Sequence, residues 1–187
     1  MKLEIISGSS RTNGNTKRVA KNLLARLNAI EGIDADLIDM ADWTHLPPIH
    51  KVFTSVENTP EEFRELSQRV FDADGFILVT PEYNGSYAPA MKNLLDHFPK
   101  QHHKPFGIVT ASPGALGGVR ASQQLLLLVP ALFGIASPYL LVVPHVDRKF
   151  SEEGELLEAS FENAIHNFTT EFLWLARSVA NVNVLNP

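Results

Sequence analysis

The segment Phe76–Val79 restricts the fold most strongly, because it is apolar at every position. A half-exposed strand alternates apolar and polar residues, so a continuous apolar run indicates a strand covered on both faces. Such strands occur in parallel sheets, whose crossover helices pack on both sides. The segment therefore predicts a central strand of a two-sided α/β sheet.

Strand-like and helix-like segments alternate along the rest of the chain. Short apolar or alternating segments predict further strands at residues 3–7, 33–38, 105–111 and 139–143. Apolar residues at helical spacing predict helices at residues 16–30, from Thr59, from Ala88, at 117–129 and at 161–179. The helix from Thr59 is expected to begin with a capping box formed by Thr59 and Glu62. This alternation predicts a five-stranded parallel sheet with helices on both faces, and we favour the strand order 2-1-3-4-5.

The predicted helix at residues 117–129 has an unusual apolar segment, Leu125–Val129. Pro130 should end or kink this helix. One face of the segment can meet the sheet, but an all-round apolar segment needs cover on its other face as well. We expect a homodimer or homotetramer built partly on this helix. Burial under the last helix is the alternative.

Length and composition narrow the class of protein. The 187 residues suffice for a core without disulfides, and we expect one domain spanning residues 1–187. The net charge of −5 gives no electrostatic support for nucleic-acid binding. The absence of cysteine excludes disulfides, thiol catalysis and cysteine-held iron–sulfur clusters. No apolar run reaches the length of a membrane span, so we expect a cytoplasmic protein that binds neither nucleic acid nor membrane.

The loop that follows the first strand, residues 7–16, has the composition of a phosphate-binding loop. Gly8 and Gly14 permit tight turns, Arg11 supplies a positive charge, and the following helix offers free N–H groups at its start. It is not a Walker A loop, because its second glycine comes one residue late and Asn15 stands where lysine is required. An ordinary polar strand-to-helix turn is the alternative interpretation.

Two more loops of special composition follow strands. Residues 80–87 contain Pro81, Tyr83 and Gly85, which suit a turn that flanks a planar ring, although an ordinary turn with a solvated Glu82 would look similar. Residues 111–118 contain three glycines. Because all three loops follow parallel strands, they should open on the same edge of the sheet, where such sheets bind ligands. A phosphate at one end and a ring at the other predict a mononucleotide.

These motifs resemble those of the NADPH-dependent FMN reductase family, which is flavodoxin-like. The matching motifs are Gly8-Ser9-Ser10-Arg11 with Gly14-Asn15-Thr16, Pro81-Glu82-Tyr83-Asn84-Gly85-Ser86 with Lys92-Asn93, and Gly114–Gly118 followed by Val119-Arg120. The resemblance covers residue 3 to about residue 180. It implies an oxidoreductase that holds FMN, takes hydride from NADPH or NADH, and reduces a small-molecule electron acceptor such as a flavin, a quinone or an azo compound.

The resemblance also implies the residues of the cofactor site. The phosphate of FMN would be held by Ser9, Arg11, Asn15 and Thr16. The isoalloxazine would be lined by Pro81, Glu82, Tyr83, Asn84 and Gly85, and its pyrimidine edge would meet Ser112 and Gly114. Many members have a serine where this chain has Gly14. No catalytic side chain and no metal are expected, since the flavin supplies the chemistry.

Two other functions share this architecture. A flavodoxin-like electron carrier would hold FMN without its own NAD(P)H turnover, but carriers are usually strongly acidic and small. A regulatory nucleotide-binding module would have no reason to retain all three loops. The histidine pair His102-His103 is best explained as solvated surface, and no Gly-x-Ser-x-Gly motif supports a hydrolase.

Overall fold

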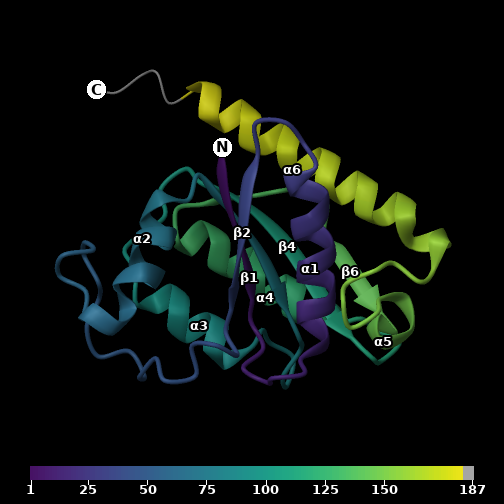
Figure 1. Cartoon of the computed structure of the whole chain (residues 1–187), viewed down its shortest axis with the longest axis horizontal. Coiled ribbons are helices and arrows are strands. Elements are labelled where there is room, and N and C mark those ends of the chain that lie inside the picture. The colour runs from purple at the N-terminus through teal and green to yellow at the C-terminus, as the bar shows by residue number, and fades with distance from the viewer. Residues whose placement is uncertain (183–187) are drawn as a thin grey trace.

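The structure, a computed structural model, describes residues 1–182 and consists of a parallel sheet between two layers of helices (Figure 1). The strands are β1 (Lys2–Ser7), β2 (Asp34–Asp39), β3 (Gly75–Thr80), β4 (Pro105–Ser112), β5 (Ile135–Ala136) and β6 (Leu141–Pro144). The α-helices are α1 (Asn15–Asn28), α2 (Arg64–Asp72), α3 (Pro89–Asp96), α4 (Val119–Ala131), α5 (Val146–Lys149) and α6 (Glu162–Val182). The strand order β2-β1-β3-β4-β5 confirms the predicted topology.

The far edge of the sheet differs from the prediction, because two short strands share it. β5 pairs with Pro105 and Phe106 at the start of β4, and β6 pairs with residues 109–112 at its end. Pro138 interrupts the chain between them, and proline cannot donate a ladder hydrogen bond. The strand predicted at residues 139–143 is β6, and the two-residue β5 is too short to give a sequence signal.

The sheet is buried on both faces, as the apolar β3 predicts. Phe76 and Leu78 belong to the core beneath α2, α3 and α4. Ile77 and Val79 belong to the core beneath α1 and α6. Alternate residues of β3 thus fill two separate cores, which explains why residues 76–79 are all apolar.

The capping box predicted at Thr59 is wrong. The Thr59 hydroxyl is buried, donates to the Ser55 carbonyl oxygen at 2.8 Å and pairs with the Ser67 hydroxyl at 2.9 Å. The chain instead enters α2 through a 3-10 turn at Glu61–Phe63, whose cap is Pro60. A tertiary contact has therefore taken the hydroxyl that the local pattern assigned to the helix.

The apolar segment on α4 is only half covered. Leu125 and Val129 are buried against the sheet, whereas Leu127 is 68% exposed. Pro130 lies inside the last turn, and the helix ends one residue later at Ala131. Because α6 packs on the opposite face of the sheet, the last helix does not provide the missing cover.

A row of polar contacts ties α1 to the first residue of α6 and to the segment that precedes it. Arg26 forms a two-pronged ion pair with Glu162, with N–O distances of 2.6 and 2.7 Å. Asn22 donates to the Gly154 carbonyl oxygen at 2.8 Å, and Lys21 donates to that of Glu152 at 2.8 Å. The helix that follows the first loop is thus held by residues more than 130 positions away in the sequence.

Within residues 1–182, no helix is both long and apolar enough to cross a membrane.

Candidate functional site

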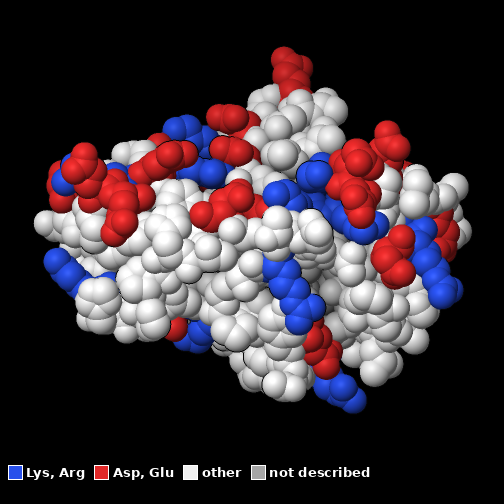
Figure 2. All heavy atoms as spheres, turned by 60° about the horizontal axis from the view of Figure 1, so that its bottom comes forward, with Lys and Arg blue, Asp and Glu red and all other residues white. Residues whose placement is uncertain are grey.

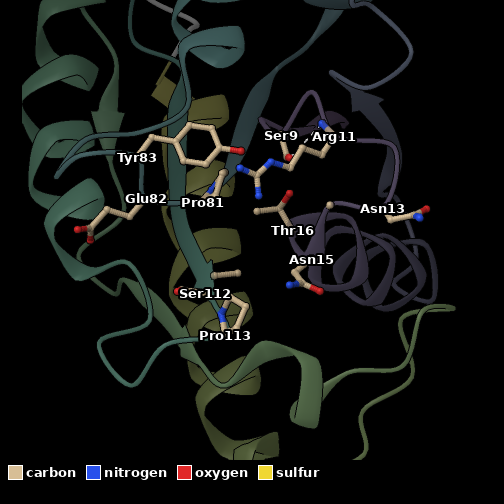
Figure 3. A pocket seen from close by; sticks show the side chains of 12 residues that line it. Ser9, Arg11, Asn13, Asn15, Thr16, Pro81, Glu82, Tyr83, Ser112 and Pro113 are labelled. Atoms are coloured by element: carbon tan, nitrogen blue, oxygen red, sulfur yellow. Dashed lines mark hydrogen bonds between the residues drawn. The ribbon is translucent and has the colours of Figure 1, made fainter.

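A pocket lies at the carboxyl edge of the sheet, where the loops after β1, β3 and β4 meet (Figure 3). The cavity has a volume of about 200 Å³ and opens to solvent. It is lined by Ser9, Arg11, Asn13, Gly14, Asn15, Thr16, Pro81, Glu82, Tyr83, Ala111, Ser112 and Pro113. The three loops that the sequence singled out therefore build one cavity.

The loop after β1 is folded tightly over the start of α1. The Gly8 N–H donates to the Val79 carbonyl oxygen at 2.8 Å, and the Gly14 N–H donates to that of Arg11 at 2.9 Å. A Cβ atom at Gly14 would lie 2.7 Å from the Ser9 hydroxyl oxygen, so any side chain there would displace Ser9. Many family members have a serine at the position of Gly14. In this chain the buried Ser9 side chain fills the space that such a serine would need.

The electrostatics of this loop favour an anion. Arg11 is the one Lys or Arg among the lining residues, and α1 has no acidic residue in its first turn. The nearby Lys17 pairs with buried Asp39 at 2.6 Å, and the hydrogen bond to that carboxylate raises the pKa of Lys17. Arg11 and the N–H groups at the start of α1 therefore give this side of the pocket a positive potential.

The loop after β3 is a small hairpin. Tyr83 and Ser86 exchange two backbone hydrogen bonds of 2.8 and 3.1 Å. Asn84 and Gly85 between them have φ angles of 52° and 81°, the left-handed values that an Asn-Gly hairpin turn requires. The Thr80 hydroxyl closes the base, donating to the Pro81 carbonyl oxygen and accepting the Ala88 N–H, each at 2.9 Å.

The two loops meet across the pocket. The Arg11 guanidinium carbon lies 5.2 Å from the centre of the Tyr83 ring, within the range of a cation–π contact. Figure 3 shows the side chains of Arg11 and Tyr83 directed toward each other. The charged side chain of Arg11 and the aromatic ring of Tyr83 are therefore in contact with each other at the opening of the pocket.

Most of the predicted site residues lie together in this pocket. Eight of them line it: Ser9, Arg11, Asn15, Thr16, Pro81, Glu82, Tyr83 and Ser112. Three others, Asn84, Gly85 and Gly114, lie in the same loops but outside the lining. Asn84 and Gly85 form the corner of the hairpin, and Gly114 donates its N–H to the Ser112 hydroxyl at 3.0 Å. The lining also includes Asn13, Gly14, Ala111 and Pro113, which lie in the three predicted loops but were not among the predicted site residues.

The Glu82 side chain reaches from the lining of the pocket to a neighbouring helix. Its carboxylate lies against the first residues of α4, 3.1 Å from the Arg120 backbone nitrogen, and points away from the centre of the pocket (Figure 3).

Other ionisable groups give no sign of a metal centre: residues 1–182 contain no group of three or more His, Asp or Glu side chains placed to bind a metal ion.

Comparison with known proteins agrees with the family resemblance of the three loops. Residues 1–146 match the model of the NADPH-dependent FMN reductase family. An FMN-dependent NADPH-azoreductase of Staphylococcus aureus is 30% identical over 164 residues, which cover 82% of each chain.

Solved structures match over nearly the whole chain. The flavoenzyme NAD(P)H:(acceptor) oxidoreductase FerB from Paracoccus denitrificans superposes with a TM-score of 0.73 at 21% identity, covering 94% of this chain and 97% of that one. A flavodoxin from Pseudomonas aeruginosa gives a TM-score of 0.57 at 17% identity, covering 92% of this chain and 99% of that one. These likenesses confirm the flavodoxin-like fold.

The family model covers most of the chain, and the curated relative that matches this chain is a reductase. The chain therefore belongs to the NADPH-dependent FMN reductase family and is an FMN-dependent NAD(P)H oxidoreductase.

Proposed function

We propose that the pocket at the carboxyl edge of the sheet holds FMN, with its phosphate on the loop after β1 and its ring beside the hairpin after β3. The observation that carries this placement is that one cavity combines Arg11 and the start of α1 with the hairpin residues Pro81 and Tyr83. A phosphate needs N–H donors and positive charge, whereas a flat ring needs backbone edges and an aromatic neighbour.

Each end of the pocket has its own task. At the phosphate end, Ser9, Arg11, Asn15 and Thr16 bind and orient the cofactor. At the ring end, Pro81, Tyr83 and the backbone of Asn84 and Gly85 flank one edge, while Ser112 and Gly114 meet the pyrimidine edge. Bound FMN supplies the redox chemistry, taking hydride from NADPH or NADH and passing it to the acceptor. No lining side chain is required as an acid or base.

The substrate side is proposed to take small planar acceptors, such as flavins, quinones or azo compounds. The named relative is an azoreductase, and the mouth of the pocket is open. Figure 2 turns this edge toward the viewer and shows much of the lower surface uncharged, with acidic and basic side chains gathered side by side along the upper part. The aromatic ring of Tyr83 in the lining suits planar organic acceptors.

We further propose a homodimer or homotetramer that uses α4, in which residues 1–187 form a single cytoplasmic domain without nucleic-acid or membrane partners. Leu127 and Leu116 are 68% and 60% exposed, and α4 carries no charged residue after Arg120. A second copy of the chain would cover these residues. Leu127→Glu should then give monomers by analytical ultracentrifugation. If the unchanged chain sediments as a monomer at micromolar concentration, the proposed oligomer is refuted.

One experiment tests the proposed function directly. The purified chain should carry, or take up, a yellow cofactor that chromatography after heat release identifies as FMN rather than FAD. Anaerobic mixing with NADPH should bleach its visible absorption rapidly before any acceptor is added. If the bound flavin stays oxidised with NADPH for minutes, yet dithionite bleaches it at once, the chain is an electron carrier and the reductase assignment fails.

A further inference from the structure

The carboxylate of Glu82 joins the hairpin after β3 to the start of α4. One of its oxygens accepts the Arg120 backbone N–H at 3.1 Å, and the other lies 3.4 Å from the Arg120 guanidinium. Glu82 precedes Tyr83 in the hairpin, so this contact crosses from the loop after β3 to the helix after β4. Figure 3 shows the side chain reaching away from the pocket toward a neighbouring helix.

The start of α4 needs such a partner. Its N-cap is Gly118, which has no side chain to offer. The N–H groups of Val119 and Ala121 donate to the carbonyl oxygens of Leu116 and Gly118, at 3.1 and 3.0 Å. The Arg120 N–H lies between them, and the first N–H groups of a helix have no acceptor within the helix itself. Glu82 therefore acts as the missing cap, with its negative charge at the positive end of the helix.

The fit between Glu82 and α4 is close. A Cβ atom at Gly118 would lie 3.5 Å from Cβ of Glu82 and 3.2 Å from Cβ of Thr110, and Gly118 has a φ angle of 84°. The Glu82 side chain is only 17% exposed, whereas the Arg120 side chain is 67% exposed. Water thus screens the ion pair, and the bond to the backbone N–H is the stronger part of the contact.

The hairpin can transmit this contact because it is held together internally. The Thr80 hydroxyl bridges its two ends, and Tyr83 and Ser86 are bonded across its tip. A unit tied in this way moves as one body. A displacement of Glu82 would consequently shift Pro81 and Tyr83 relative to the loop after β4.

We propose that Glu82 is a positioning residue for the reductase reaction: by capping α4 it fixes the distance between the two loops that flank the ring end of the pocket. Pro81 and Tyr83 lie on one side of that gap, and Ser112 and Pro113 lie on the other. The inference rests on the proposed placement of the flavin ring in this gap. It assigns Glu82 an indirect role, exerted through the backbone of Arg120.

The test compares Glu82→Ala, Glu82→Gln and Arg120→Ala in the FMN-saturated protein. Glu82→Ala removes the cap, and its anaerobic bleaching by saturating NADPH should slow about tenfold, because misplacement by about 1 Å can cost up to about a hundredfold. Its visible flavin band should also shift. Glu82→Gln keeps an oxygen for the Arg120 N–H and should stay within about threefold of the unchanged chain. Arg120→Ala keeps its backbone N–H and should likewise stay within about threefold, since it loses only a screened ion pair.

Glu82→Asp provides a milder variant should Glu82→Ala fail to fold. It keeps the charge but draws the carboxylate back by one methylene, and it should bleach more slowly than Glu82→Gln. The inference is overturned if the folded Glu82 variants bleach at the unchanged rate with an unshifted flavin band, or if Arg120→Ala slows bleaching as much as Glu82→Ala. A failure of the unchanged chain itself to bleach would instead refute the proposed function, and this inference with it.

Discussion

The two ends of the pocket differ in the side chains that they present and in how their loops are attached to the rest of the fold. The hairpin at the ring end is bonded to itself across Tyr83 and Ser86, closed at its base by Thr80 and capped onto α4 through Glu82. The loop at the phosphate end is also held by backbone hydrogen bonds, from the N–H groups of Gly8 and Gly14, but its charged side chain, Arg11, is exposed. We infer a division of labour in which the phosphate end supplies affinity through charge, and the ring end supplies geometry through rigidity.

The largest expected effect comes from removing the charge at the phosphate end. Arg11→Ala should weaken FMN binding by about 1.5–3 kcal/mol, the usual range for hydrogen bonds to charged groups. This corresponds to about a tenfold to hundredfold rise in Kd, measured by fluorescence titration. At saturating FMN, the bleaching rate should change little.

Lys21→Ala is the matched control for Arg11. It removes a positive charge from the same region, but Lys21 donates to the Glu152 carbonyl oxygen and does not line the pocket. Equal losses of affinity in both variants would mean that only the overall charge matters, and would end the distinction between the two ends of the pocket.

A smaller effect is expected from crowding the phosphate loop. Gly14→Ala would place Cβ 2.7 Å from the Ser9 hydroxyl oxygen and 3.1 Å from the Arg11 carbonyl oxygen. We expect the free energy of unfolding to fall by about 1–2 kcal/mol, as for overpacked sites, with weaker FMN binding because Ser9 is displaced. Thermal unfolding and FMN titration check both parts. Unchanged binding would show that Ser9 does not contact the cofactor.

At the ring end, substitutions at two glycines distinguish the energetic cost of backbone strain from the cost of side-chain crowding. Gly85→Ala should cost about 1 kcal/mol of unfolding free energy, because Gly85 has a φ angle of 81°, although Cβ would make only an ordinary 3.9 Å contact with the Arg120 side chain. Gly114→Ala, whose Cβ would make an ordinary 3.4 Å contact with the Ser112 hydroxyl oxygen, should change stability by less than about 0.5 kcal/mol. Equal costs in chemical denaturation would contradict a hairpin held in the left-handed conformation.

The smallest effect concerns the support of α1, which carries the phosphate end. A hydrogen bond from Arg26 lowers the pKa of Glu162 below its ordinary value of 4.5. A carboxyl with a lowered folded pKa stabilises the fold above the unfolded pKa, and this contribution is lost as pH falls through the folded pKa. Glu162→Gln should therefore cost about 0.5 kcal/mol at pH 7, since the pair is partly exposed, and the difference should vanish in acid.

Denaturation curves of Glu162→Gln at pH 7 and pH 3, each with and without high salt, provide the measurement. Exposed Glu153 offers the control, because Glu153→Gln changes the charge by the same amount at a short distance. A loss that persists at pH 3 would show that Glu162 acts through packing rather than charge.

The sequence was sufficient for the sheet and for the three loops, because both depend on local patterns. The apolar Phe76–Val79 segment could only be a strand with two buried faces, and strand alternation then placed the loops at one edge. The structure corrected the contacts between distant residues. The contact between Glu82 and Arg120 has no sequence signal, since it joins elements that only the tertiary fold brings together. The bond between Thr59 and Ser67 spans only eight residues, but no local capping pattern indicates it.

The left-handed hairpin corner, by contrast, has a local signal in the sequence, although only a turn was predicted there. Asn-Gly is the strongest short-range signal for a two-residue hairpin turn, and Asn84-Gly85 adopts it. The short β5 was not readable, because two residues between Gly134 and Pro138 give no periodicity. Fold and site location therefore follow from the sequence, while the direction of individual side chains does not.

The contacts between α1 and the segment before α6 have a consequence for the lifetime of the protein. Ligand that binds only the intact site raises the free energy of every opening that disrupts the site, by about 2.7 kcal/mol at 100 times Kd. Detachment of residues 152–162 would release Lys21, Asn22 and Arg26 and loosen the helix on which the phosphate is proposed to rest. Amide hydrogen exchange and protease cleavage in this distant segment should then report how fully the pocket is loaded, and the empty chain would be the form that degrades first.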